Sequence, residues 1–208
     1  HDTKRSEDVR ARINVLSEIP REWAERFDRW CELNQHHKTR IDDELAPDAN
    51  EEFLLYQNLL GAWPFETPTD QERAVFVKRI RDYFAKALHE AKQHTSWATP
   101  HVEYDAAADE FVSRILDPAG SAEFLADFIA FQAKISRWGM WNSLSQTLLR
   151  LTAPGVPDTY QGTELWDFSL VDPDNRRPVD YTLRDDMLKA LKSAEQAAGD
   201  DRSRIALA

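Results

Sequence analysis

The chain has 208 residues, with 26 Lys and Arg against 37 Asp and Glu, which gives a formal net charge of −11. A chain this acidic is a poor candidate for binding nucleic acid or an anionic membrane through its overall field, and its sequence has no apolar run of about 18 residues that could span a bilayer. One cysteine and six glycines exclude an internal disulfide framework and Cys-rich zinc modules, and they argue against a Gly-rich phosphate loop.

Apolar residues at helical spacing predict helices along most of the chain. Ser6 is the expected N-cap of the first helix, and Pro20 suits the first position of the second. In chain order, the predicted helices cover residues 6–17, 20–33, 50–60, 70–93, 104–116, 121–138, 139–151 and 182–197.

Glycine, proline and polar residues mark the breaks between these helices. Gly61 is expected to end the third helix, and Gly139 to separate the sixth from the seventh. Residues 34–47 are expected to form a polar loop. Residues 156–161 form a short β-compatible segment, and residues 164–179 are loop-like. The pattern predicts a mainly helical protein with an irregular C-terminal third.

Several conspicuous side chains are expected to be structural. Trp138 and Trp141 lie three residues apart in the sequence, a spacing that favours core packing over a platform for a sugar. Cys31 lies on the apolar side of its helix and is expected to pack there. The histidines beyond residue 30 have no convincing ligand spacing, so we predict no metal site.

A polar cluster opens the chain ahead of the first helix. His1-Asp2-Thr3-Lys4-Arg5 combines an imidazole, a carboxylate and two cations. Chemistry on sugars uses such a mixture, because a carboxylate can hydrogen-bond ring hydroxyls and these bonds strengthen as an oxocarbenium-like transition state forms. A frayed polar terminus beside a helix cap explains the same residues without a function.

Two further clusters lie in the C-terminal third. Residues 155–166 carry carboxylates, a phenol, an amide and an indole, groups that suit the faces and hydroxyls of sugar rings. A structural loop whose aromatic side chains plug a core is the alternative. Residues 172–178 (DPDNRRP) favour a salt-bridged turn, because Pro, Asp and Asn set turns and paired arginines bind carboxylates.

Together, these clusters resemble the C-terminal portion of the maltooligosyltrehalose synthase family, within the alpha-amylase superfamily. Residues 1–12 (HDTKRSEDVRAR) are similar to the segment that ends the seventh strand of that family's (β/α)8 barrel. Residues 139–166 resemble the helix leading into the eighth strand and the loop after it, and residues 172–181 resemble the segment that follows. The helices over 20–137 resemble the large helical insertion of the family.

The resemblance implies a mainly α chain that combines a helical insertion with the seventh- and eighth-strand portion of a (β/α)8 barrel. Residues 1–19 would end strand seven and form the following helix, and residues 20–137 would form the insertion. Residues 138–208 would supply a helix, strand eight, its loop and a final helix.

The resemblance also assigns roles residue by residue. Asp2 matches the superfamily's third carboxylate, which stabilises the transition state, and is therefore the implied catalytic residue. His1 matches the neighbouring sugar-binding histidine. The other implied substrate-binding residues are Lys4, Arg5, Tyr160, Gln161, Glu164 and Trp166. No metal and no cofactor are implied.

The implied parent enzyme is a (1→4)-α-D-glucan 1-α-D-glucosylmutase, which converts the reducing-end α-1,4 link of maltooligosaccharides to an α,α-1,1 link. The family's nucleophilic Asp and acid/base Glu would both precede His1. A start at His1 without Met predicts a fragment, and we expect the chain alone to be inactive. Its expected partners are a maltooligosaccharide and the remainder of the parent barrel, with no nucleic acid or membrane.

Three further expectations stay open at this point. Without a signal sequence or disulfides, the protein is expected in the cytoplasm. Another alpha-amylase-type glucan hydrolase or glucosyltransferase is an alternative function. A helical binding module without catalytic activity is the second alternative, and it explains the acidity and the missing catalytic pair.

Overall fold

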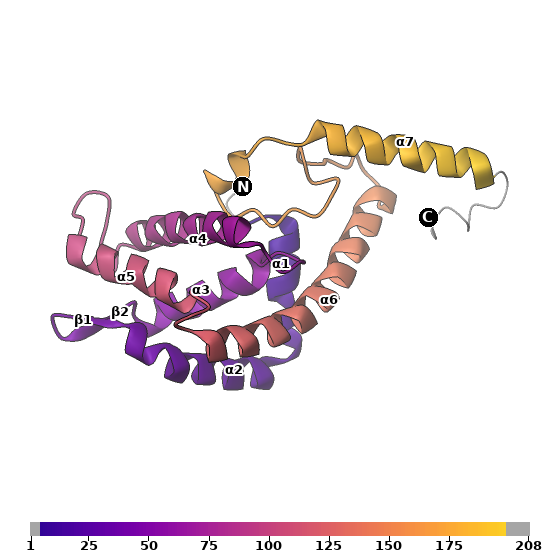
Figure 1. Cartoon of the computed structure of the whole chain (residues 1–208). Coiled ribbons are helices and arrows are strands. Elements are labelled where there is room, and N and C mark those ends of the chain that lie inside the picture. The colour runs from indigo at the N-terminus through magenta and orange to yellow at the C-terminus, as the bar shows by residue number, and fades with distance from the viewer. Residues whose placement is uncertain (1–4, 199–208) are drawn as a thin grey trace. The chain divides into compact units, whose positions relative to one another are not determined.

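The computed structural model describes residues 5–198 (Figure 1). The α-helices are α1 (Glu7–Asn14), α2 (Pro20–Asn34), α3 (Ala49–Ala62), α4 (Asp70–Ala91), α5 (Val102–Ile115), α6 (Ala122–Thr152) and α7 (Tyr181–Ala198). Single 3₁₀ turns cover Val15–Glu18, Gln35–His37 and Asp174–Arg176, and two strands, β1 (Thr39–Ile41) and β2 (Glu44–Ala46), form a hairpin. The prediction of a mainly helical chain is confirmed. None of the described helices is both long and apolar enough to cross a membrane.

The described residues divide into two compact units. Residues 5–158 and 166–176 form the first, which holds α1 to α6 and the hairpin. Residues 159–165 and 177–198 form the second, which holds α7 and the loop with Tyr160 and Glu164.

Two helix starts follow the predicted signals, and two more have capping boxes that were not predicted. Ser6 is the N-cap of α1 and accepts a hydrogen bond from the amide of Val9. Pro20 is the first residue of α2. Asp48 and Thr69 each form a capping box with the glutamate three residues later, at the starts of α3 and α4. Capping boxes satisfy amides that a helix start leaves without partners, so these ends are fixed by local sequence.

The core of the first unit is rich in aromatic rings. Trp30 on α2 is fully buried, and its ring lies 5.3–5.8 Å from the rings of Tyr56, Phe124 and Phe128. Its indole Nε1 donates to the Asp127 carboxylate at 2.7 Å. Large rings supply much of the apolar area that a helical core buries, and here they join α2 to α3 and α6.

Two glycines have a different role from the predicted one. Gly61 lies inside α3, and Gly139 lies inside the continuous helix α6. A Cβ at Gly61 would lie 2.6 Å from Val9 Cγ1, and one at Gly139 would lie 2.5 Å from Arg12 Cγ and 2.9 Å from Arg12 Cα. Both glycines therefore serve close helix contacts with α1 (Figure 1), so the predicted helix end and helix break were wrong.

Two predicted irregular or extended segments also differ. Residues 34–47, expected as a polar loop, contain the hairpin, in which Thr39 pairs with Ala46 around a turn at Asp42. Strands of three residues are too short to show a period in the sequence. Residues 156–161 form no strand, because strands need hydrogen-bonded neighbours and the described part of the chain supplies none beside them.

The predicted burial of Trp138 and Trp141 is wrong. Their exposed fractions are 51% and 60%, and Leu144 and Leu148 farther along α6 are 52% and 63% exposed. Apolar spacing predicts which side chains share a helix face, but burial also needs a neighbouring element. The C-terminal half of α6 has an uncovered apolar face within the described residues.

Candidate functional site

Four of the eight predicted site residues belong to the segment at the start of the chain, and only Arg5 among them is described. His1, Asp2 and Lys4 lie outside the described residues. Arg5 forms an isolated antiparallel bridge with Leu170, and its Nε donates to the Asn58 carboxamide of α3 at 2.6 Å. Arg5, the last residue of the predicted catalytic segment, is therefore held next to Asn58 of α3 and Leu170.

The segment after the predicted loop is attached to the start of α1. Ser6 donates from its amide to the Ser169 carbonyl at 3.0 Å and from its hydroxyl to the Asp167 carbonyl at 2.5 Å. The Asp167 amide donates to the Asp8 carboxylate at 2.8 Å. Burial raises the pKa of Asp8, and the Asp167 hydrogen bond opposes that rise. Two sequence clusters 161 residues apart thus lie together.

Trp166 places an aromatic surface beside this junction. Its ring is 42% exposed and meets Phe65 edge-on at 5.8 Å, while Phe65 meets Phe168 edge-on at 4.9 Å. Exposed aromatic rings can pack against the apolar faces of sugar rings. Trp166 lies next to two aromatic residues that sequence reasoning did not identify, Phe65 and Phe168, and its role in substrate binding stays a prediction.

Beneath these rings lies Arg12, a buried cation. It is 1% exposed, its guanidinium lies 3.6 Å from the Phe168 ring centroid, and its Nη1 donates to the carbonyls of Gly61 and Trp63 at 3.0 and 2.5 Å. Burial lowers the pKa of Arg12 to about 9, and the charge of Asp8 opposes this shift. Sequence reasoning missed this residue, although it lies in the first resemblance motif.

The other predicted loop residues lie in the second unit. Tyr160 is 65% exposed, and its carbonyl accepts from Thr163. Gln161 is exposed. The Glu164 carboxylate accepts from Arg184 Nε at 3.0 Å, and this bond lowers the pKa of Glu164. A carboxylate held ionised by an arginine is poorly suited to act as a general acid.

The predicted turn at residues 172–178 is confirmed. Asp174 accepts two hydrogen bonds from Arg79 of α4, at 2.7 and 2.9 Å, and one from the Leu170 amide at 2.8 Å. Arg176 forms an ion pair with Asp172. These residues fix the chain just after the Trp166 segment, which supports a structural role.

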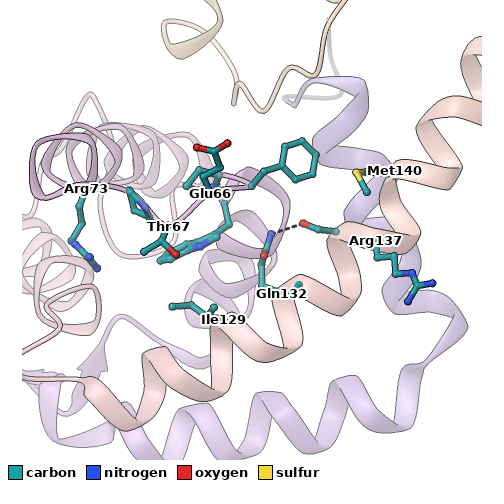
Figure 2. A pocket seen from close by; sticks show the side chains of 13 residues that line it. Glu66, Thr67, Arg73, Ile129, Gln132, Arg137 and Met140 are labelled. Atoms are coloured by element: carbon teal, nitrogen blue, oxygen red, sulfur yellow. Dashed lines mark hydrogen bonds between the residues drawn. The ribbon is translucent and has the colours of Figure 1, made fainter. Parts of the chain in front are cut away.

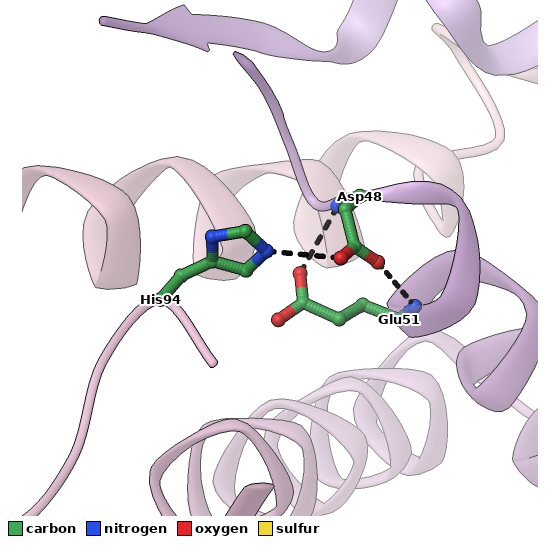
Figure 3. Close-up of side chains that lie close together, drawn as sticks. All are labelled: Asp48, Glu51 and His94. Atoms are coloured by element: carbon green, nitrogen blue, oxygen red, sulfur yellow. Dashed lines mark hydrogen bonds and ion pairs between the residues drawn. The ribbon is translucent and has the colours of Figure 1, made fainter. Parts of the chain in front are cut away.

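A separate polar cluster joins the hairpin, α3 and the α4–α5 connection (Figure 3). His94 Nε2 lies 2.9 Å from Asp48 Oδ2, and His94 Nδ1 lies 3.2 Å from Glu44 Oε2. Glu51 accepts from the Asp48 amide and from the Tyr104 hydroxyl. One ligand atom from each of Asp48, Glu51 and His94 lies within 4.8 Å of the others, so these three side chains could hold a cation.

The contacts of the cluster favour protonated His94, in place of a bound cation, as the source of its positive charge. A carboxylate lies at each ring nitrogen of His94, and the Asp48 and Glu51 carboxylates already cap the positive end of α3. Burial lowers the pKa of His94, but the hydrogen bond with Asp48 and the charges of Glu51 and Glu44 outweigh it and raise the pKa. We therefore interpret the cluster as an imidazolium clamp.

We expect the clamp to stabilise the protein more at pH 5.5 than at pH 8.5. A raised histidine pKa contributes stability that is complete below the unfolded value of about 6.5 and is lost as pH rises through the folded value. The change His94→Gln should cost about 1 kcal/mol more at pH 5.5 than at pH 8.5. Urea unfolding of both proteins at the two pH values measures this difference.

A matched control for the clamp is His36→Gln. His36 is an exposed histidine on the 3₁₀ turn that precedes the hairpin, so its replacement tests the effect of removing one imidazole without removing the clamp. An equal cost of His94→Gln at both pH values would show that His94 acts through packing on Tyr104, whose ring lies 4.6 Å from it.

Comparisons with known proteins show that nearly the whole chain is similar to about a quarter of longer proteins. No protein-family model matches it. A Mycobacterium tuberculosis protein provisionally named maltooligosyl trehalose synthase is 42% identical over 192 residues, which cover 92% of this chain and 23% of that protein. A crystal structure of maltooligosyl trehalose synthase matches with a TM-score of 0.77 at 35% identity, covering 92% of this chain and 24% of its own. A glycosyltrehalose synthase structure matches with a TM-score of 0.77 at 37% identity, covering 97% and 25%.

Proposed function

We propose that this chain, which spans about a quarter of the maltooligosyltrehalose synthases it matches, contributes to an intramolecular transglycosylase. The observation that carries the proposal is a similarity of sequence and of fold that runs through nearly the whole chain. The substrate would be a maltooligosaccharide, whose reducing-end α-1,4 link becomes an α,α-1,1 link.

The described geometry supports a contribution to a sugar site. Arg5, three residues after Asp2, is fixed by Leu170 and Asn58. Trp166 lies in the segment bound to Ser6 and Asp8, with its ring partly exposed. Asp2 itself lies outside the described residues, and its proposed role as the carboxylate that stabilises an oxocarbenium-like transition state rests on the resemblance.

The chain would supply only part of the catalytic machinery. Retaining chemistry on glycosides uses two carboxyl groups about 5–5.5 Å apart, and in the described residues the most suitable loop carboxylate, Glu164, is bound by Arg184. The remainder of the parent barrel would bring the nucleophile and the acid/base. The exposed apolar face of α6, with Trp141 and Leu148, is the kind of surface that such a partner covers.

An exchange of segments tests the proposal. The matching 192-residue segment of the Mycobacterium tuberculosis relative is replaced by this chain, and the hybrid is given maltopentaose. We expect the reducing ends to disappear while the number of glucose units per molecule stays constant, as mass spectrometry and a reducing-sugar assay would show. The 208-residue chain alone should leave maltopentaose unchanged.

Other products would separate the alternatives. A hybrid that releases glucose and raises the number of reducing ends would identify a glucan hydrolase. Activity of the 208-residue chain by itself would show that the catalytic pair lies within it, against the proposal. A folded hybrid without any activity on maltopentaose would favour the helical binding module.

A further inference from the structure

A cleft of about 270 Å³ opens between the α3–α4 connection and the middle of α6 (Figure 2). Residues 63–68 of the connection form one wall, Arg73 of α4 contributes from a second side, and Ile129 to Met140 of α6 form the third. The volume lies just below the range of about 300–1,000 Å³ that ligand sites occupy, which limits a ligand to a small one. None of its lining residues was predicted to bind substrate.

The α6 wall of the cleft contains buried polar groups. Gln132 and Ser136 are 4% and 7% exposed, and Gln132 Nε2 donates to Ser136 Oγ at 2.7 Å. Their buried neighbours on the same helix, Phe128, Phe131 and Ile135, are apolar. Burying an amide costs free energy unless it is hydrogen-bonded, and Gln132 and Ser136 meet part of this requirement by bonding to each other. The pair places an amide and a hydroxyl in the lining of the cleft.

A buried hydrogen-bond donor of Arg73 on α4 also belongs to a residue that lines the cleft. Arg73 Nε has less than 1 Å² of accessible surface and no hydrogen-bond partner among the described residues, although the chain carries 37 acidic residues. In Figure 2 the Arg73 side chain lies at the edge of the cleft, with Thr67 between it and Gln132, and Arg73 also borders a second pocket between α4 and α5. Buried unsatisfied donors are rare in folded proteins, and this one lines a space in which a ligand oxygen could accept its hydrogen bond.

An aromatic ring at the rim completes the lining. Phe65 is 45% exposed and is held edge-on by Phe168 and by Trp166. It therefore belongs both to the cleft and to the aromatic surface of the predicted substrate residue Trp166. A ring face beside amide, hydroxyl and guanidinium donors matches the alternating apolar faces and hydroxyl edges of a sugar.

We infer that this cleft binds one or two glucose units of an α-1,4-glucan, with Arg73 and Gln132 bonding to hydroxyls and Phe65 packing on a ring face. Two arginines and one glutamate line the cleft, but the net charge of −11 on the whole chain repels anions, so we choose a neutral ligand. The choice of an α-1,4-glucan rests on the proposed function. The cleft would then be a second glucan contact outside the predicted catalytic segment.

Titration of the 208-residue chain with maltotriose tests the inference. Amide shifts in ¹H–¹⁵N spectra should locate binding at residues 63–73 and 129–140 and give a dissociation constant. Arg73→Met and Gln132→Leu should each weaken that constant about tenfold, the effect of losing one hydrogen bond that involves a charged or buried group. Two matched controls, Arg21→Met and Trp97→Ala, replace exposed residues that do not line the cleft and should change it less than about twofold.

The outcomes separate this inference from the proposed function. Unchanged dissociation constants in folded Arg73→Met and Gln132→Leu proteins would overturn the cleft site, as would maltotriose shifts confined to residues 160–166. Equal affinity for cellotriose would refute the α-1,4 preference. The segment exchange described above uses product formation, so a hybrid that forms the α,α-1,1 product with no binding in the cleft would leave the proposed function intact and reject the cleft alone.

Discussion

Asp2→Asn in the complete hybrid enzyme is expected to lower transfer and hydrolysis together, each by about 10²–10³-fold. The resemblance assigns Asp2 the carboxylate that stabilises the positive charge of the transition state, and one preorganised electrostatic contact is worth about this much in rate. The amide keeps the shape of the side chain but removes its charge. Both reactions share the same glycosyl transition state, so their ratio should stay constant.

The measurement is kcat for loss of reducing ends and for release of glucose from maltopentaose. Asp43→Asn is a matched control, because Asp43 is an exposed aspartate in the hairpin turn, and it should leave both rates within about twofold. Transfer that survives in Asp2→Asn with less than a tenfold loss would contradict the assigned role. A change in the ratio of the two rates would show that Asp2 affects whether glucose or water attacks the glycosyl intermediate.

The sequence predicts helices best where spacing and caps agree. The fourth predicted helix matches α4 to within two residues at its end, because an apolar stripe over Phe76, Ile80 and Phe84 follows a threonine cap. Gly61 and Gly139 were misinterpreted because a glycine can end a helix or admit a close neighbour. Only the position of α1 against both helices decides between the two.

Only those parts of the candidate site that form continuous sequence motifs could be predicted. The polar start of the chain and the Trp166 loop could be singled out from composition and resemblance. Their contact through Ser6, Asp8 and Asp167 depends on the fold of everything between them. The clamp at His94 combines side chains from three separate elements, and the cleft at Arg73 also combines three chain segments. The residues of each site are therefore far apart in the sequence and form no short motif.

Arg12→Ala is expected to destabilise the first unit by about 3–5 kcal/mol, the largest effect on stability among the substitutions considered. The change leaves the carbonyls of Gly61 and Trp63 without their donor, removes a cation from the Phe168 ring and opens a cavity where a fully buried side chain lay. Loss of one partner from a buried charged contact and truncation of a large buried side chain each cost several kcal/mol. Urea unfolding followed by tryptophan fluorescence measures the loss.

Arg10→Ala is the matched control, because Arg10 is an exposed arginine on the same helix, and it should change the unfolding free energy by less than about 0.5 kcal/mol. A loss below about 1 kcal/mol in Arg12→Ala would show that water replaces the guanidinium.

Arg12 also contacts the Phe65 ring at 4.7 Å, and Phe65 forms the rim of the proposed glucan cleft. The change Arg12→Met keeps most of the volume of the aliphatic part of the side chain and removes its charge. The affinity of this variant for maltotriose should therefore fall even where the protein is fully folded. One buried cation would then connect the end of α3, the aromatic surface at Trp166 and the cleft.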